Sequence, residues 1–226
     1  MKRLLLYVHF NKYNKISEHV YYQLEHMHPL FSKVIFISNS QLDEGEVGKL
    51  RQSQLIDAFI QRENIGYDFA AWHDGMAFEG FENLKAYDSV TAMNDTCFGP
   101  LWDMAPVYDK YESDEKVDFW GMTNHRAIDA GHIYIDEHLQ SYFMSFKKSI
   151  VISEVFQEFW KSVEAYTDVQ KVIDNYETKY TKRFVDAGFR YASVLNTVPI
   201  ADNFFHSNFT IHYPHVLLDN HVPFIK

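Results

Sequence analysis

The sequence contains one cysteine, Cys97, carries no excess of basic residues and has no long apolar run. A single cysteine excludes an intrachain disulfide and favours a reducing compartment such as the cytoplasm. The formal net charge of −10 argues against a nucleic-acid binder, because such proteins present a basic face. No segment approaches the ~20 apolar residues of a membrane-spanning helix. The apolar run that begins at Leu4 is too short for a signal peptide and predicts a buried strand.

Several motifs of common enzyme classes are also absent. The sequence has no Gly-x-Ser-x-Gly elbow, no Gly-x-x-x-x-Gly-Lys phosphate loop and no Gly-x-Gly-x-x-Gly fingerprint. The histidines include one group in the middle of the chain and one near its end, namely His125, His132 and His138, and His206, His212 and His215. Neither group has a zinc-like spacing to cysteine. These absences give no support for a serine-hydrolase triad, a P-loop enzyme or a structural zinc.

The 226 residues suit one domain, and the pattern along them is an alternation of short apolar runs with helical segments. The expected strands are residues 4–10, 34–37, 59–62, 89–93, 117–122 and 139–146, and the expected helices are residues 18–28, 43–55, 67–76, 152–163 and 173–187. This order predicts a layered α/β domain with a mostly parallel sheet. The apolar pattern continues to the last residues, as in a fragment of a longer chain.

Polar residues follow four of the expected strands directly. They are Asn11, Asn39, Asn64 with Gly66, and Asn94 with Asp95. Parallel sheets bind ligands at the carboxyl ends of their strands, so these side chains predict a polar crevice. The alternative is that each one only forms a turn.

Asn94 and Asp95 are the first chemical candidates. A carboxylate at this place could hold Mg²⁺ or Mn²⁺, which would bridge the phosphates of a sugar nucleotide. An Asp after a strand is also a common turn former, and the dipeptide alone leaves both interpretations open.

Asp68 is the second candidate, in the first turn of a helix that follows the glycine turn at Gly66. A helix N-terminus can receive a phosphate or a ribose hydroxyl. Asp68 could equally cap its own helix.

Asp174 and Glu177 have the spacing Asp-x-x-Glu at the start of a predicted helix. This is the pattern of a capping box, in which each side chain covers a free backbone N–H. The other interpretation is a general base that takes a proton from an acceptor hydroxyl.

Taken together, the motifs resemble the rhamnan synthesis protein F family of bacterial polysaccharide assembly. The matching segments occur in family order over nearly the whole chain. They are Arg62–Asp68, Ala92–Leu101, Asp118–Thr123, His138–Met144, Phe159-Trp160, Tyr176-Glu177, Gly188-Phe189 and Pro223–Lys226. The resemblance implies a GT-A-like (Rossmann-like) layered sandwich, in which a mostly parallel central sheet is flanked by helices. It also implies a single glycosyltransferase domain over residues 1–226, with a nucleotide-sugar-binding half (1–123) and an acceptor-side half (124–226).

The resemblance also implies roles for individual residues. Those expected to bind the nucleotide sugar are Asn11, Asn39, Asn64, Gly66, Asp68, Asn94 and Asp95. Glu177 would be the catalytic base, with Asp174 as second choice. The residues expected to contact the acceptor or a sugar are His138, Gln140, Ser141 and Tyr142, whereas Trp120 is expected to pack in the core. Asp95 and His212, or else His206, would hold a divalent cation. The chain departs from the Asp-x-Asp pattern, because Asn94-Asp95-Thr96 has one carboxylate.

The function implied is an inverting transfer of a sugar to a growing cell-surface polysaccharide, with dTDP-rhamnose as the donor and a lipid-linked glycan as the acceptor. Such an enzyme would act in the cytoplasm, in peripheral contact with the inner face of the membrane. Two other hypotheses remain. One is a non-catalytic module that binds a nucleotide sugar or a glycan, because a fold does not guarantee activity. The other is a sugar-nucleotide hydrolase.

Overall fold

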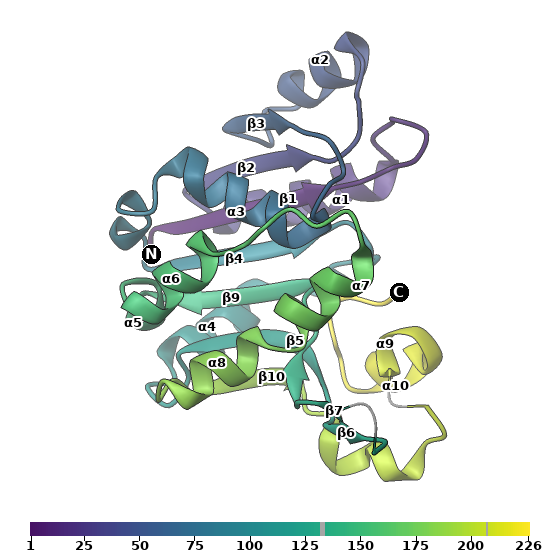
Figure 1. Cartoon of the computed structure of the whole chain (residues 1–226). Coiled ribbons are helices and arrows are strands. Elements are labelled where there is room, and N and C mark those ends of the chain that lie inside the picture. Colours follow the sequence, from purple (N-terminus) through teal and green to yellow (C-terminus); the bar gives the residue numbers. More distant parts are fainter. Residues whose placement is uncertain (132–133, 207) are drawn as a thin grey trace.

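The computed structural model describes residues 1–131, 134–206 and 208–226. His132 of the central histidine group lies outside these ranges. Within them, a central sheet has the strand order β10-β5-β9-β4-β1-β2-β3, and β8 pairs with β5 beside it (Figure 1). Strands β4, β1, β2 and β3 run parallel to one another, β10 runs parallel to β5, and β9 is antiparallel to both β4 and β5. The fold is therefore the mixed α/β sandwich with a mostly parallel sheet that the sequence predicts.

The strands are β1 (Arg3–His9), β2 (Lys33–Ser38), β3 (Ala58–Gln61), β4 (Ser89–Asn94), β5 (Phe119–His125), β6 (Ile128–Asp129), β7 (Tyr134–Ile135), β8 (His138–Leu139), β9 (Phe143–Lys147) and β10 (Tyr191–Leu195). The α-helices are α1 (Glu18–Met27), α2 (Glu44–Gln52), α3 (Tyr67–Glu79), α4 (Ala105–Ser113), α5 (Lys148–Val151), α6 (Glu154–Lys161), α7 (Val169–Val172), α8 (Tyr180–Asp186), α9 (Phe209–His212) and α10 (Pro214–Asp219). Single turns of 3₁₀ helix are η1 (His28–Leu30), η2 (Asn83–Ala86) and η4 (Val198–Asn203), and η3 (Ile173–Glu177) is a π-helical turn. None of the described helices is long and apolar enough to span a bilayer.

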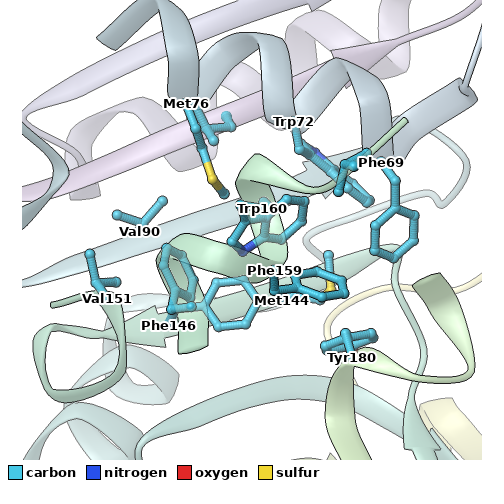
Figure 2. Packing of buried hydrophobic residues seen from close by; sticks show 14 of the residues in the cluster. Phe69, Trp72, Met76, Val90, Met144, Phe146, Val151, Phe159, Trp160 and Tyr180 are labelled. Carbon is cyan, nitrogen blue, oxygen red and sulfur yellow. The ribbon is translucent and has the colours of Figure 1, made fainter. Parts of the chain in front are cut away.

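Two hydrophobic clusters cover the two faces of the sheet, because successive side chains of a strand point to opposite faces. In β1, Leu4 and Leu6 belong to one cluster, whereas Leu5 and Tyr7 belong to the other. Figure 2 shows the first cluster, in which aromatic side chains of α3, α6 and α8 pack over β4 and β9; those labelled are Phe69, Trp72, Phe159, Trp160 and Tyr180. The second cluster takes residues from α1, α4 and the C-terminal segment. Trp120 is fully buried in it, so this ring packs in the core as predicted.

The order of the sheet reverses between β1 and β4. From β1 the chain passes outward through β2 and β3, and then returns to place β4 on the other side of β1. Ligands of open α/β sheets bind in the crevice outside the carboxyl ends of the strands at such a switch point. Figure 1 shows the C-terminus, α7 and α9 at this same edge, beyond the arrowheads of β1 and β4.

The structure differs from the predicted element order mainly in the second half. The predicted helix over 173–187 is broken into the π-helical turn η3 and the separate helix α8. The strand-like region 139–146 forms two strands, β8 and β9. Helix α4, the edge strand β10 and the hairpin β6–β7 were not predicted. Strand β10 depends on its pairing with β5, which is distant in the sequence, and the two-residue strands β6 and β7 are too short to show a periodicity.

Candidate active site

A pocket of about 330 Å³ lies at the switch-point edge of the sheet. It is lined by residues from six segments that are far apart in the sequence. They are Asp68, Asn94, Thr96, Gln140, Ser141, Tyr142, Ile173, Glu177, Asn208, Thr210, Ile211 and Lys226. Six of these positions, among them Asp68, Asn94 and Glu177, were named from the sequence, so the structure brings together residues that the sequence could only nominate separately.

On one side of the pocket, which we call the β4 side, lie Asp68, Asn94 and Thr96. The Asn94 side chain donates a hydrogen bond from Nδ2 to Asp68 Oδ2 at 2.7 Å, and its Oδ1 accepts from the backbone N–H and the hydroxyl of Thr96 at 3.2 and 2.7 Å. Asn94 therefore forms the turn that the simpler interpretation required and also holds a carboxylate. Asp68 reaches across to Asn94 rather than capping its own helix, so the capping interpretation of Asp68 is wrong.

Asp95 lies behind Asn94, between the pocket and the end of β1. Its Oδ2 accepts a hydrogen bond from the Phe10 N–H at 3.2 Å and lies 3.8 Å from His9 Nε2. Its own N–H donates to the carbonyl of Val8, which ties the end of β4 to the end of β1. The described pocket lining includes Asp68 but not Asp95, so on this side of the pocket the carboxylate in the lining comes from α3.

The two carboxylates near β4 are poorly compensated. Burial and, after it, the charge of Asp68 together raise the pKa of Asp95 to about 7. Burial, with a smaller contribution from the charge of Glu177 and against the hydrogen bond from Asn94, raises the pKa of Asp68 to about 6. Buried carboxylates that repel each other indicate a place where a positive charge or an anion-bridging cation would be favourable.

These donors fit a hard divalent cation that is shared with phosphate oxygens. Mg²⁺ is commonly held by one or two carboxylates, and phosphates of the substrate complete its ligands. Asp68 and Asp95 could supply the protein oxygens. Within the described residues, no three His, Cys, Asp or Glu side chains are placed to form a complete metal site. Any cation here would therefore depend on the ligand for part of its coordination.

The histidines near the C-terminus have another arrangement. His212 stacks on His206, with ring centroids 4.0 Å apart. Thr210 and Ile211 of the same one-turn helix are in the described lining of the pocket, whereas His206 and His212 are not. We therefore do not assign His212 or His206 as the third ligand that the resemblance implied.

The opposite side of the pocket, which we call the Glu177 side, is built from Ser141 and Glu177. Glu177 Oε1 accepts hydrogen bonds from the hydroxyl and the backbone N–H of Ser141, at 2.9 and 3.4 Å. The residues of η3 form a π-helical turn, in which Thr178 N–H donates to the carbonyl of Ile173. Ile173 and Glu177 line the pocket, whereas Tyr176 between them is buried against Phe69. Such turns often occur at functional sites, because they shift the register of side chains.

Asp174, the second choice for the base, is exposed. Its Oδ1 accepts a hydrogen bond from Gln170 Nε2 at 2.8 Å. Because Glu177 is bound to Ser141 and Asp174 to Gln170, the pair does not form the capping box that was the alternative interpretation. The N-terminus of α7 is instead capped by Asp168.

Gln140, Tyr142 and His138 have unequal access to the pocket. Gln140 lines it, and its side chain is hydrogen-bonded to those of Thr123 and Asn208. Tyr142 lines it but is largely buried, and its hydroxyl lies 3.0 Å from that of Thr123. His138 is buried, and its Nδ1 lies 2.8 Å from the carbonyl of Asp136. Among the three, Gln140 is the residue best placed to contact a ligand.

The ends of β1, β2 and β3 form a polar cluster next to Asp95. The hydroxyl of Ser40 accepts from the Asn11 N–H and donates to the Asn11 carbonyl, and Asn39 Oδ1 accepts from Arg62 Nη1 at 2.8 Å. Asn39 Nδ2 is buried without a hydrogen-bond partner among the described atoms. These strand ends lie side by side, but the described lining of the pocket contains Asn94 and neither Asn11 nor Asn39, so ligand binding by the latter two stays a prediction.

Gly66 and Asn64 belong to the turn that leads into α3. Gly66 has φ +74°, and a side chain on it would collide with Ala165. Its N–H donates to the carbonyl of Tyr166, so Gly66 shapes the turn that presents Asp68. Asn64 is half-buried in this turn.

Sequence reasoning missed Lys226, Thr96 and the residues of α9 that line the pocket. Pro223–Lys226 was noted as a motif, but no role was given to it. No local pattern signals the position of Lys226, because it depends on the pairing of Ile225 with Phe98.

Comparison with solved structures supports the fold. The chain aligns with a mannosyltransferase from Pyrobaculum calidifontis, solved in complex with GDP-Man and Mn²⁺, at a TM-score of 0.52 and 8% identity. The alignment covers 84% of this chain and 54% of that one. At this identity the similarity shows a shared GT-A-like fold.

Comparison of sequences identifies the family. The chain is 30% identical over 181 residues to protein y4gN of Sinorhizobium fredii, and 30% identical over 147 residues to the virulence protein VirA of Vibrio anguillarum. These alignments cover 79% and 64% of this chain, and the chain spans less than half the length of either relative. The sequence model of rhamnan synthesis protein F matches residues 34–226. The chain therefore belongs to the rhamnan synthesis protein F family.

Proposed function

We propose that this chain is the catalytic domain of an inverting glycosyltransferase that uses a nucleotide-activated sugar. One observation carries the proposal: a pocket at the switch point of a GT-A-like sheet has a poorly compensated carboxylate, Asp68, on its β4 side, with Asp95 behind it, and a hydrogen-bonded carboxylate, Glu177, on the opposite side. The first group suits the diphosphate of a donor, and the second suits a base.

The reaction requires two bond changes and one proton transfer. An acceptor hydroxyl oxygen would form a bond to the anomeric carbon of the donor sugar, while the bond from that carbon to the diphosphate oxygen breaks. Glu177 would take the proton of the hydroxyl, and the nucleoside diphosphate would leave. Ser141 holds Glu177 Oε1, so this hydrogen bond would orient the base and leave Oε2 for the acceptor.

A divalent cation bound by Asp95 and Asp68 would neutralise charge on the leaving diphosphate. The residues of the chain would act around it. Asn94 fixes Asp68 through the 2.7 Å hydrogen bond, and the Phe10 N–H fixes Asp95. The polar cluster that contains Asn11 and Asn39 lies at neighbouring strand ends, and together with Asn64 in the turn before α3 it would receive the nucleoside.

The identity of the substrates is the finer part of the proposal. The family is named for rhamnan synthesis, which supports dTDP-rhamnose as the donor and a growing, lipid-linked cell-surface polysaccharide as the acceptor. A lipid-linked acceptor would bring the protein to the cytoplasmic face of the membrane. Because the structural relative was solved with GDP-Man, guanosine and uridine sugar nucleotides belong in the same test.

The test combines nucleotide binding with sugar transfer. Calorimetry with dTDP, UDP and GDP, each with Mn²⁺, would identify the preferred nucleobase. Crystals soaked with the same ligands would show which residues of the pocket bind them. Transfer from the matching sugar nucleotide to a lipid-linked oligosaccharide would then be measured for wild type, Asp95→Ala and Glu177→Gln. We expect Glu177→Gln to lose about a thousandfold in kcat, because general-base catalysis contributes 10²–10⁴-fold, roughly.

Asp174→Asn is the matched control, since it neutralises an exposed carboxylate three residues away, outside the described pocket lining. It should retain wild-type activity within about twofold. Transfer by Asp95→Ala and Glu177→Gln at the wild-type rate would contradict the proposal. Tight nucleotide binding with no transfer to any acceptor would instead indicate the non-catalytic binding module.

A further inference from the structure

The last four residues of the chain are held against the loop that follows Asn94-Asp95-Thr96. Phe98 and Ile225 form an antiparallel bridge, with Phe98 N–H donating to Ile225 O at 2.7 Å and Ile225 N–H donating to Phe98 O at 3.0 Å. The Leu101 N–H also donates to the carbonyl of Pro223 at 2.8 Å. Three backbone hydrogen bonds therefore fix where the next residue, Lys226, lies.

Side chains support the same arrangement. Phe224 is 1% exposed and packs on Phe143, with ring centroids 5.8 Å apart. Gly99 has φ +143°, and a Cβ at this position would collide with the carbonyl of Pro223. This close approach requires glycine in the loop. The segment 223–226 is thus packed against the rest of the fold, and Lys226 lines the pocket. Figure 1 shows the C-terminus beyond the arrowheads of β1 and β4.

Lys226 is the only cationic side chain in the described lining of the pocket, and it is exposed there. The pocket and the loop behind it also contain Asp68, Asp95 and Glu177. Lys226 lowers the pKa of Asp68, although burial and the charge of Glu177 raise it more strongly. A bound diphosphate would add further negative charge, so one divalent cation alone would leave the site with an excess of anions.

We infer that Lys226 binds the diphosphate of the donor nucleotide. This inference rests on the proposed function and adds to it a specific binding residue. The ammonium group donates up to three hydrogen bonds as a compact positive charge, which suits phosphate oxygens. The loop Asn94-Asp95-Thr96 has one carboxylate and would bind a cation more weakly than a loop with two. Lys226 would compensate for this, because its ammonium group is itself a positive charge next to the diphosphate.

The test compares ligands that share a base but differ in phosphate. Affinities of wild type, Lys226→Met and Lys226→Arg would be measured by calorimetry for the nucleoside diphosphate that wild type binds best, and by competition for its nucleoside, with Mn²⁺ and with EDTA. Lys116→Met is the matched control, because Lys116 is exposed near the opposite edge of the sheet and its loss changes the net charge equally.

Lys226→Met should weaken binding of the diphosphate about ten- to hundredfold, and the nucleoside less than about twofold. The loss should be larger in EDTA, where Lys226 would be the main positive charge, and Lys226→Arg should restore most of the affinity. Lys116→Met should bind like wild type.

Two results for Lys226→Met would overturn the inference. An equal loss of affinity for the nucleoside and the nucleoside diphosphate would show that Lys226 only packs in the site, and no loss for either would show that it has no role in binding. These outcomes leave the proposed function intact as long as wild type binds a nucleoside diphosphate. If wild type binds none of dTDP, UDP and GDP, the proposed function itself fails, and the inference fails with it.

Discussion

The two sides of the pocket hold their carboxylates in different ways. On the Glu177 side, the carboxylate receives two hydrogen bonds from Ser141. On the β4 side and directly behind it, burial is the main cause that raises the pKa of Asp68 to about 6 and that of Asp95 to about 7. The charge of Glu177 contributes to the rise for Asp68, and the charge of Asp68 to the rise for Asp95. The first arrangement is stable by itself, whereas the second is unfavourable until a positive charge arrives.

This difference assigns the orientation of the catalytic base to the Glu177 side and the binding of a cation and a diphosphate to the β4 side. A base needs a fixed direction, and the Ser141 hydrogen bonds supply it at little cost to stability. A site for a cation and a diphosphate needs uncompensated negative charge nearby, and that charge destabilises the protein without ligand. Substitutions of the carboxylates at the β4 side should therefore raise the free energy of unfolding. Substitutions on the Glu177 side should instead lower kcat.

The largest effect on stability is expected for Asp95→Asn. The Asp95 side chain is 10% exposed, and burial followed by the Asp68 charge raises its pKa from 3.8 to about 7. Asn keeps the acceptor for the Phe10 N–H and removes the charge. We expect the free energy of unfolding at pH 8, from urea titration, to rise by about 2 kcal/mol.

The dependence on pH checks the cause. Because the native pKa of Asp95 is higher than the unfolded one, the native state binds the proton more tightly, and wild type loses stability as pH rises from about 4 to about 7. The advantage of Asp95→Asn should grow over this window, stay constant above it and vanish below pH 4. A smaller advantage of Asp95→Asn in an Asp68→Asn background would confirm the repulsion. An advantage that does not depend on pH would contradict it.

Ser141→Ala tests the other side of the pocket. Removal of the hydroxyl leaves the backbone N–H of Ser141 as the remaining donor to Glu177 Oε1, at 3.4 Å. We expect kcat to fall about tenfold, equivalent to about 1.4 kcal/mol, while KM for the donor is unchanged, because an orienting contact acts on the base rather than on the nucleotide. Steady-state kinetics with the donor and acceptor identified above would measure it.

Ser149→Ala is the control for this substitution. Ser149 also donates from its hydroxyl to a carboxylate, Asp118 Oδ1 at 2.9 Å, near the opposite edge of the sheet. It should leave kcat unchanged. If Ser141→Ala raised KM tenfold and left kcat alone, Ser141 would be a binding residue, and the contrast between the two sides would be wrong.

The same contrast explains what the sequence could reveal. Strands β1 to β4 and helix α3 were predicted because their apolar periodicity is local, and Asp68, Asn94 and Asp95 follow from the ends of those elements. The turn chemistry was also local, but which partner Asp68 takes was not. Its hydrogen bond to Asn94 joins two elements that only the sheet brings together.

The Glu177 side depends on features with weaker signals. A π-helical turn has the same residue preferences as the helix around it, so the break over Ile173–Glu177 was read as continuous helix. The half-buried strand β10 is too short and too mixed to stand out. Lys226 reaches the pocket because Ile225 pairs with Phe98, and no pattern in either segment alone predicts that pairing.

The smallest effect expected is the response of the ligand-free protein to a divalent cation. Mn²⁺ at several times its Kd should stabilise the protein at pH 8 by about 1 kcal/mol, which for a chain of this size raises Tm by about 2–4 °C. At pH 5 the response should disappear, because Asp68 and Asp95, with pKa values of about 6 and about 7, are then mostly protonated. The double variant Asp68→Asn/Asp95→Asn should lose the response at both pH values. A double variant of exposed carboxylates, Asp109→Asn/Asp114→Asn, removes the same charge elsewhere and should keep it. Equal stabilisation at pH 5 and pH 8 would mean that the cation binds elsewhere on the protein. Lys226 would then be the positive charge that compensates the carboxylates on the β4 side.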